Sequence, residues 1–161
     1  MTPAPAATAL TITTDPSRLD LDVIHGFLAG SYWAAGIPRE IAERAVRHSL
    51  CFGVFDGDHQ VGFARVVSDY ATYAYVCDVF VLPSHRGRGV GKQLMAAVVA
   101  HPDLQGLRRW TLFTRDAHGL YRHYGFGEAR YPERLMEILS PPYDAPAAPA
   151  HGDHSPESSP R

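Results

Sequence analysis

The sequence predicts a single domain of the mixed α/β (α+β) class, with a central, mixed but mostly antiparallel sheet of about six to seven strands and about four helices. Its 161 residues suit one domain, and its 45% hydrophobic content is ample for a compact core. Strand-like runs and helical periodicities follow one another along the chain, and one pair of runs is joined by a hairpin signal. We expect a flexible N-terminus over residues 1–8, the domain over residues 9–140, and a disordered Pro/Ala/Ser/His tail over residues 141–161.

The first part of the domain predicts a strand followed by a helix. Leu10 to Thr13 alternates and contains β-branched residues, as an opening strand does. Asp20 can cap a helix that runs through Leu28.

A second helix opens at Pro38 and runs through His48, and its predicted apolar face consists of Ile41, Ala45 and His48. Between the two helices lies a glycine-bounded connector that contains Tyr32 and Trp33. We expect these aromatic side chains to plug the core; the functional alternative is that they line an acceptor pocket.

The middle of the chain predicts an antiparallel pair of strands and then a central strand. Residues 50–56 and 60–68 are strand-like, and the turn signal Asp-Gly-Asp-His at residues 56–59 divides them. Tyr73 to Val81 is the longest strand candidate, and we expect it at the centre of the sheet.

The next helix has an apolar face that should pack on the sheet, formed by Val90, Leu94, Ala97, Val98 and His101. Arg109 to Thr114 is another buried-type strand, and a strand, helix, strand unit of this length implies a parallel, right-handed crossover. Ala117 to Tyr124 predicts a short helix that Gly125 ends. Residues 126–131 and 135–139 are expected to close the domain as two more strands.

The most informative stretch is the junction of the central strand with the following helix, Asp78 to Lys92. The first backbone N–H groups of such a helix lack internal partners, and the helix dipole adds positive potential at the same end. Glycines allow a ligand to approach the backbone closely, and cationic side chains surround the same place. These residues are Gly87, Gly89 and Gly91 with Arg86, Arg88 and Lys92. The stretch therefore predicts a phosphate ligand, and in particular a diphosphate.

Spacing argues against two common phosphate-binding loops. A nucleotide-hydrolysing P-loop needs glycine at the position of Arg86 and Ser or Thr at that of Gln93. A dinucleotide-binding fingerprint would need its third glycine at Lys92 or Leu94. A nucleotide-phosphate hydrolase is therefore a weakened hypothesis.

Two motifs carry a resemblance to a known family. Arg86 to Gly91 fits Arg-x-x-Gly-x-Gly, which resembles the pyrophosphate-binding motif of the GNAT superfamily of acyl-CoA-dependent N-acetyltransferases. Ala117 to Phe126 matches that family's second motif, Ala-x-x-Leu-Tyr-x-x-x-Gly-Phe. The resemblance extends from Leu10 to Leu139, although the N-terminal part matches only in pattern. It implies the GNAT fold, whose sheet splays between strands 4 and 5, and acetyl-CoA as the cosubstrate bound in that splay.

The resemblance also implies roles for particular residues. The backbone of Val79 to Val81 would hold the pantetheine arm, and the Val79 N–H would stabilise the oxyanion. Tyr121 would be the general acid for the leaving thiolate, with helix packing as the alternative, whereas Tyr124 is expected to pack. The expected cofactor-binding residues are Val79, Phe80, Val81, Arg86, Gly87, Arg88, Gly89, Val90, Gly91, Lys92, Thr114, Ala117 and Tyr121.

The general base has no clear counterpart, because the glutamates of some family members are absent. Asp78 on the central strand is the catalytic candidate, and Asp116 and His118 begin the acid-bearing helix. The structural alternatives are a hydrogen bond from Asp78 to a neighbouring loop, a helix cap at Asp116 and a solvated His118. A water chain is a further option. Thr114 replaces an asparagine with which family members commonly contact the cofactor arm.

The function that the resemblance implies is acetyl transfer from acetyl-CoA to a primary amine by direct attack in a ternary complex, without transfer of aminoacyl groups. The alternative is a non-catalytic acyl-CoA-binding sensor or interaction module. The acceptor, a small amine or a lysine-type side chain, is not defined by the sequence. An aromatic-lined pocket is hinted at by Tyr32, Trp33, Tyr70, Tyr73 and Tyr131. An open sheet edge would allow a homodimer.

Composition limits partners and compartment. A formal net charge of -2 gives no basic field for nucleic acid, and the absence of a signal sequence or membrane span predicts a cytoplasmic protein. Cys51 and Cys77 lie in apolar runs, so we expect reduced core thiols, with a disulfide or a catalytic thiol as alternatives. No metal site is expected, because His118 and His123 diverge on their helix.

Overall fold

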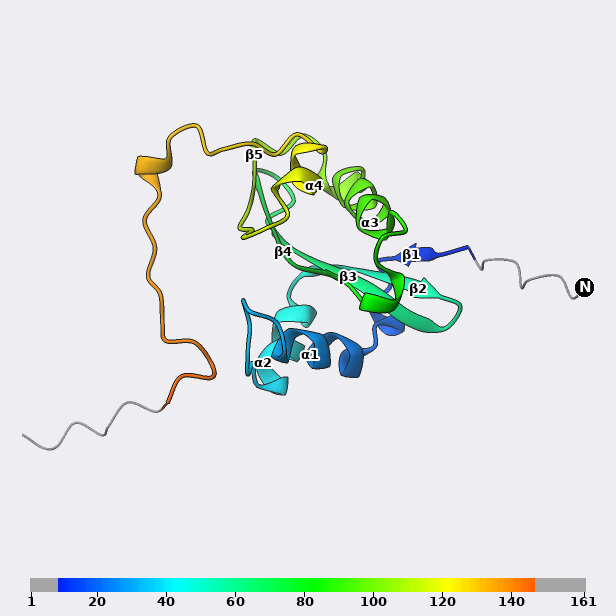
Figure 1. The fold of residues 1–161 in the computed structure, drawn as a ribbon. Helices are drawn as coiled ribbons and strands as arrows, with labels where there is room; N and C mark the ends of the chain where they lie inside the picture. The colour runs from blue at the N-terminus through cyan, green and yellow to red at the C-terminus, as the bar shows by residue number, and fades with distance from the viewer. Residues whose placement is uncertain (1–8, 147–161) are drawn as a thin grey trace, which may run out of the picture.

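A computed structural model describes residues 9–146 (Figure 1). The predictions for residues 1–8 and for the tail beyond residue 146 lie outside the described residues. The strands of the described part are β1 (Thr11–Thr13), β2 (Leu50–Asp56), β3 (His59–Ser68), β4 (Tyr73–Val81) and β5 (Arg109–Leu112). Its α-helices are α1 (Leu21–Ala29), α2 (Arg39–Arg47), α3 (Val90–Val99) and α4 (His118–Arg122).

The strands form one mixed sheet in the order β1-β2-β3-β4-β5. Neighbours from β1 to β4 are antiparallel, whereas β5 is parallel to β4 because α3 carries the chain back along the sheet. The β2–β3 hairpin turns at Gly57, whose φ of 60° lies in the left-handed region that glycine adopts readily. The predicted fold class is confirmed, although the described sheet has fewer strands than expected.

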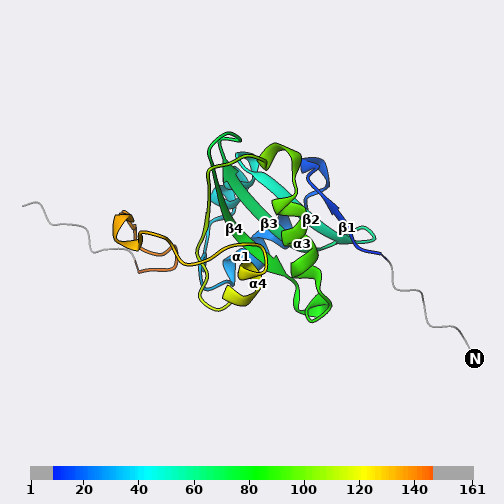
Figure 2. The same ribbon diagram turned by 90° about the horizontal axis from the view of Figure 1, so that it is seen from above.

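Helices cover both faces of the sheet (Figures 1 and 2). The α1–α2 pair lies on one face, and α3 with α4 lies on the other. Each layer has its own apolar cluster. On the α3 face the helix buries Val90, Leu94, Met95 and Val98. At about 1.5–3 kcal/mol for each buried side chain, this face contributes about 6–12 kcal/mol before conformational entropy is subtracted.

The start of α1 agrees with the sequence, and the face of α2 agrees in part. The Asp20 carboxylate accepts hydrogen bonds from the first turn of α1, and the Gln60 amide oxygen accepts one from the Asp20 N–H at 2.8 Å. On α2 the predicted apolar face is confirmed for Ile41, which packs against the core, but it is wrong for His48, which is exposed, and it missed the buried Ala42. Ala42 packs in the same cluster as Ile24 and Leu28 of α1, where a small side chain allows the helices to approach.

The two closing strands predicted over residues 126–131 and 135–139 are wrong. Past α4 the chain leaves the sheet as an extended arm, which we define as residues 127–144 (Figure 1). Among the described residues, no backbone hydrogen bond joins residues 127–140 to β5. A strand needs a hydrogen-bonding partner, and among the described residues the arm has none in the sheet.

Candidate functional site

The glycine-rich loop presents the N-terminus of α3 to solvent. β4 ends at Val81, and Gly89 is the N-cap residue of α3 in the left-handed region, with a φ of 75°. No side chain caps the helix. A Cβ built on Gly87 or on Gly89 would meet nothing within 4 Å, so the backbone faces open space. The first N–H groups of α3 are therefore accessible to a ligand.

Three exposed cations surround this opening, as the sequence predicted: Arg86, Arg88 and Lys92. The Arg86 Nε donates to the Val81 carbonyl at 2.9 Å, which fixes the guanidinium at the end of β4. A hollow of about 260 Å³ lies between this loop and Leu120 of α4. The helix dipole and the cations both favour an anion in this hollow.

A second anchor of the loop was not predicted. The His85 Nε2 lies 2.9 Å from the Asp56 Oδ2, and its Nδ1 lies 2.8 Å from the Ser84 hydroxyl. Asp56 ends β2, so this pair connects the loop to the β2–β3 hairpin. The two residues are 29 positions apart, and no local pattern marks them as partners.

Beside the loop, β4 and β5 separate. Their parallel register ends with Val76 opposite Leu112, whereas β4 continues to Val81. The edges of the two strands therefore part next to the N-terminus of α3. This is the splay that the family resemblance implied.

A bulge in β4 adjoins this splay. The β3–β4 register shifts between Phe63 and Arg65, so Asp78 and Val79 have no ladder partner on either neighbouring strand. Asp78 has a φ of 52°, a left-handed conformation that aspartate tolerates better than most residues. The Val79 backbone is thus left outside the ladder at the point where the two strands part.

The Asp78 carboxylate is held by two donors. Its Oδ1 accepts a hydrogen bond from the Trp33 indole Nε1 at 2.9 Å, and its Oδ2 accepts one from the Arg65 Nε at 2.7 Å. The Asp78 and Arg65 side chains are only 12% and 17% exposed, so this ion pair is largely shielded from water. Asp78 therefore connects the bulge to the α1–α2 connector.

Tyr121 is the buried residue of α4. Its ring packs edge-on against Phe126, with 6.1 Å between ring centroids. Burial raises the pKa of Tyr121 to about 12, and nearby Tyr32 and Asp116 raise it further to a smaller extent. Within residues 9–146 the hydroxyl has no hydrogen-bond partner, and no unpaired side-chain polar atom is fully buried. The hydroxyl therefore reaches solvent and stays protonated at neutral pH.

The other residues predicted around α4 have mostly structural contacts. The Tyr124 hydroxyl donates to the Lys92 carbonyl at 2.5 Å, which joins α4 to the first turn of α3 and confirms its packing role. The Thr114 hydroxyl oxygen accepts from the N–H of Ala117, the N-cap residue of α4, at 3.0 Å. No side chain caps α4, so the helix-cap alternative for Asp116 is wrong. Asp116 and His118 are both exposed to solvent.

The prediction that Tyr32 and Trp33 plug the core is wrong, since they are 51% and 41% exposed. Instead, they connect the α1–α2 connector to β4 and to the segment before α4. Trp33 reaches Asp78, while the Tyr32 hydroxyl accepts from the Arg115 N–H at 3.3 Å and the Arg115 guanidinium lies 3.8 Å from the Tyr32 ring centroid. The two aromatic rings meet edge to face.

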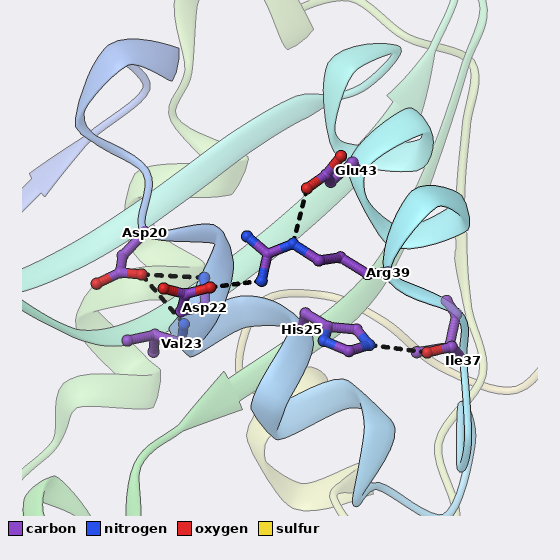
Figure 3. A network of polar contacts seen from close by, with 7 residues as sticks. All are labelled: Asp20, Asp22, Val23, His25, Ile37, Arg39 and Glu43. Carbon is purple, nitrogen blue, oxygen red and sulfur yellow. Dashed lines mark hydrogen bonds and ion pairs between the residues drawn. The ribbon is translucent and has the colours of Figure 1, made fainter.

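Polar contacts between α1 and α2 hold this connector at its base (Figure 3). The His25 Nε2 donates to the Ile37 carbonyl at 2.9 Å, next to the start of α2. Arg39 bridges Asp22 of α1 and Glu43 of α2. The Arg39 pairs are solvent-exposed and contribute little individually, but together they fix the ends of the loop that carries Tyr32 and Trp33.

Both cysteines are free, which confirms the expected reduced thiols. Burial raises the pKa of Cys51 and of Cys77 to about 12. Such thiols stay protonated at neutral pH and are poor nucleophiles. Separately, no helix of the described residues is long and apolar enough to cross a membrane.

A mixed sheet that splays beside a basic, glycine-rich helix N-terminus defines an α/β protein with an opening that favours an anion. Comparison with known proteins makes the class specific: residues 47–128 match the model of the acetyltransferase (GNAT) domain family. The chain belongs to the GNAT acetyltransferase family.

Individual relatives agree with this assignment. A crystal structure of a Xanthomonas campestris pv. campestris protein, described as belonging to the GNAT family, is 54% identical with a TM-score of 0.83, over 87% of this chain and 100% of that one. A Gibberella zeae protein named "Putative acetyltransferase FG08082" is 31% identical over 68% of this chain and 74% of its own length. The aminoglycoside N-acetyltransferase AAC(6')-Iy, solved in complex with CoA, shares the fold at 22% identity and a TM-score of 0.59, over 85% of this chain and 98% of that one.

Proposed function

We propose that this protein transfers the acetyl group of acetyl-CoA to a primary amine by direct attack within a ternary complex. One observation carries the proposal: the N-terminus of α3 opens beside the place where β4 and β5 part, and Val79 lies outside the ladder there. The CoA complex of the structural neighbour supports the choice of cosubstrate.

The residues present fit a diphosphate-bearing cosubstrate. Gly87 and Gly89 leave the space for it, because both have positive φ and no atom occupies the position of an added Cβ. Arg88 and Lys92 supply exposed positive charge, and Arg86 is held in place by the Val81 carbonyl. The edge of β4 from Val79 to Val81, which has no partner on β5, can bond an amide-containing arm as a strand would. The Phe80 side chain packs on the opposite face, so only its backbone can take part.

Three groups would carry the chemistry. The thioester supplies the activated acetyl group. The Val79 N–H stabilises the negative charge that develops on the carbonyl oxygen. Tyr121 donates its proton to the departing thiolate, a role that its raised pKa permits because the phenol stays protonated. Thr114 holds the N–H of Ala117, the residue that precedes α4, and so positions the helix that carries Tyr121.

We assign Asp78 a positioning role and the general base to water. Both Asp78 oxygens already accept strong hydrogen bonds, from Trp33 and Arg65, so Asp78 holds the connector against the bulge. Asp116 and His118 are exposed and could exchange protons with a water chain. Protonated thiols at Cys51 and Cys77 favour direct attack over an acyl-enzyme.

The α1–α2 connector, which carries Tyr32 and Trp33, would form one wall of the pocket for the acceptor amine. Tyr32 and Trp33 face the site with exposed aromatic surface, which can hold a cationic amine against ring faces. The Arg115 guanidinium already stacks on Tyr32, so that an acceptor ammonium would compete for this ring. A small aromatic or aliphatic amine fits this wall.

The test is a screen of primary amines with acetyl-CoA, using Tyr121→Phe and the matched control Tyr124→Phe. We expect Tyr121→Phe to lower kcat by about 10²-fold without changing acetyl-CoA affinity, because only the proton donor is lost. The control should keep kcat within about a factor of three, since Tyr124 bonds the backbone of α3. Tight acetyl-CoA binding without transfer to any amine would instead establish the sensor alternative.

A further inference from the structure

The loop between β4 and α3 is fixed to the rest of the fold at few points. At its start, the Leu82 N–H donates to the Val61 carbonyl of β3 at 2.8 Å. Among the described residues, residues 83–88 make a single hydrogen bond to a part of the chain other than β4 and the loop itself, and it joins His85 to Asp56. The position of the backbone that faces the basic opening therefore depends on this contact.

Both nitrogens of the His85 ring are engaged. Nε2 lies 2.9 Å from the Asp56 Oδ2, and Nδ1 lies 2.8 Å from the Ser84 hydroxyl oxygen. Because an ionised carboxylate only accepts hydrogen bonds, Nε2 carries the proton that is donated to Asp56. In the neutral ring Nδ1 is then an acceptor, so the Ser84 hydroxyl donates to it. The ring therefore acts as a donor toward the β2–β3 hairpin and as an acceptor toward its own loop.

The contact is sheltered, and its far end is held by the sheet. The His85 and Asp56 side chains are 14% and 33% exposed, so the hydrogen bond is partly shielded from water. Asp56 is the last residue of β2, next to the hairpin turn that Gly57 makes possible with a φ of 60°. A hydrogen bond to a charged partner is stronger than one between neutral groups. The hairpin can thus hold the loop in one place.

The same ring borders the basic opening. His85 lines the hollow of about 260 Å³ together with Arg86 and Lys92. With both nitrogens already engaged, the ring has no free polar atom to offer a ligand. Any effect of His85 on a bound anion must therefore pass through the loop, in which His85 directly precedes Arg86 and lies four residues before Gly89, the N-cap residue of α3.

We propose that His85 and Asp56 are positioning residues that hold this loop in the conformation that receives the diphosphate of acetyl-CoA. The inference rests on the proposed function, because it names the residues that prepare that site. A loop already held in its bound conformation loses less conformational freedom when the ligand binds, which raises the affinity. Neither side chain belongs to the three groups that would carry the chemistry. Loss of the pair should therefore weaken binding without slowing transfer from bound acetyl-CoA.

The first test is calorimetric titration of acetyl-CoA, combined with kcat for an accepted amine at saturating acetyl-CoA. We expect His85→Ala and Asp56→Ala each to raise the Kd by about 10-fold or more, with kcat kept within about threefold. The double variant should bind no more weakly than the weaker single variant, because both remove the same contact. His85→Gln should recover most of the affinity, since its amide can donate to Asp56 and accept from Ser84. His59→Gln, at an exposed histidine of the same hairpin, is the matched control and should leave the Kd within about twofold.

The outcomes separate the inference from the proposed function. An unchanged Kd in both single variants, additive losses in the double variant, or a kcat that falls as far as the Kd rises overturns the inference and leaves the proposed function in place. Absence of acetyl-CoA binding to the unmodified protein overturns the proposed function, and the inference with it.

A second measurement needs no ligand. Nitrogen NMR of the imidazole rings in the free protein at about pH 8 reports which nitrogen of a neutral ring carries the proton, and His85→Gln assigns the resonances. The structure predicts the Nε2–H form for His85, and Asp56→Ala should shift these resonances. A proton on Nδ1 overturns the inference, because Nε2 could not then donate to Asp56.

Discussion

The role of Asp78 gives a graded prediction. Asp78→Asn keeps a side chain that tolerates the left-handed backbone of the bulge, but it removes the negative charge facing Arg65. Asp78→Gly keeps the backbone conformation and loses both hydrogen bonds. Asp78→Ala loses both hydrogen bonds and also forces alanine into a φ of 52°. Stability should therefore fall in the order Asn, Gly, Ala.

The magnitudes follow from burial and geometry. A hydrogen bond to a charged group contributes about 1.5–3 kcal/mol, and the low exposure of the Asp78–Arg65 pair puts it in the upper part of that range. Asp78→Asn should thus lower the free energy of unfolding by about 2–3 kcal/mol. The left-handed strain on alanine adds about 1–2 kcal/mol, which brings Asp78→Ala to about 3–5 kcal/mol.

The assay is urea unfolding followed by tryptophan fluorescence, combined with the KM for the acceptor. A double-mutant cycle with Arg65→Met should give a coupling free energy of about 2 kcal/mol, because the two groups are direct partners. Loss of the Trp33 contact should raise the acceptor KM more than it lowers kcat. Stability within about 0.5 kcal/mol of the unmodified protein for both Asn and Ala variants would refute the buried pair. Intact stability with abolished transfer would make Asp78 the general base.

Further predictions concern the loop, the thiols and α4. Gly89→Ala should lower the free energy of unfolding by about 1–2 kcal/mol and weaken acetyl-CoA binding, because Gly89 has a φ of 75°. Gly119→Ala, inside α4, should instead raise the free energy of unfolding by about 0.5–1 kcal/mol. Thermal melts would measure both stabilities, and calorimetry would measure the binding. The free energy of unfolding should fall as pH rises above 9, because the pKa of Cys51 and of Cys77 is raised to about 12 in the folded protein. Below pH 9 the folded and unfolded states both keep the thiol protons. Between about pH 9 and 12 only the unfolded state loses them, which favours unfolding. Cys51→Ala should flatten this slope in urea titrations at several pH values, and an unchanged slope would contradict the buried-thiol explanation. Tyr124→Phe should cost about 1 kcal/mol by removing the bond to the Lys92 carbonyl, measurable as a shift in the urea midpoint.

Local signals predicted most of the elements well. The Asp20 cap, the Asp56–His59 turn and the glycine-rich loop each act within a few residues, so the sequence contains the interaction itself. Tyr121 followed from a motif confined to one short helix. In each case, the determining contact is between near neighbours in the chain.

Other features depend on contacts between distant segments. Trp33 and Asp78 are 45 residues apart, and their hydrogen bond depends on how α1 and α2 sit on the sheet. The bulge places Asp78, which is not a glycine, at a positive φ, so the sequence contains no local signal for it. The two closing strands were predicted from local sequence, and their absence follows from the lack of a pairing partner within the described chain.

The most direct test of the proposed acyl-CoA site is calorimetric titration of acetyl-CoA into the protein, with Arg86→Ala and Gly89→Asp as loop variants and Arg47→Ala on α2 as the control. The proposal predicts micromolar binding for the unmodified protein and the control, and loss of binding in both loop variants. Absence of binding in the unmodified protein, or equal binding in all four proteins, would contradict it.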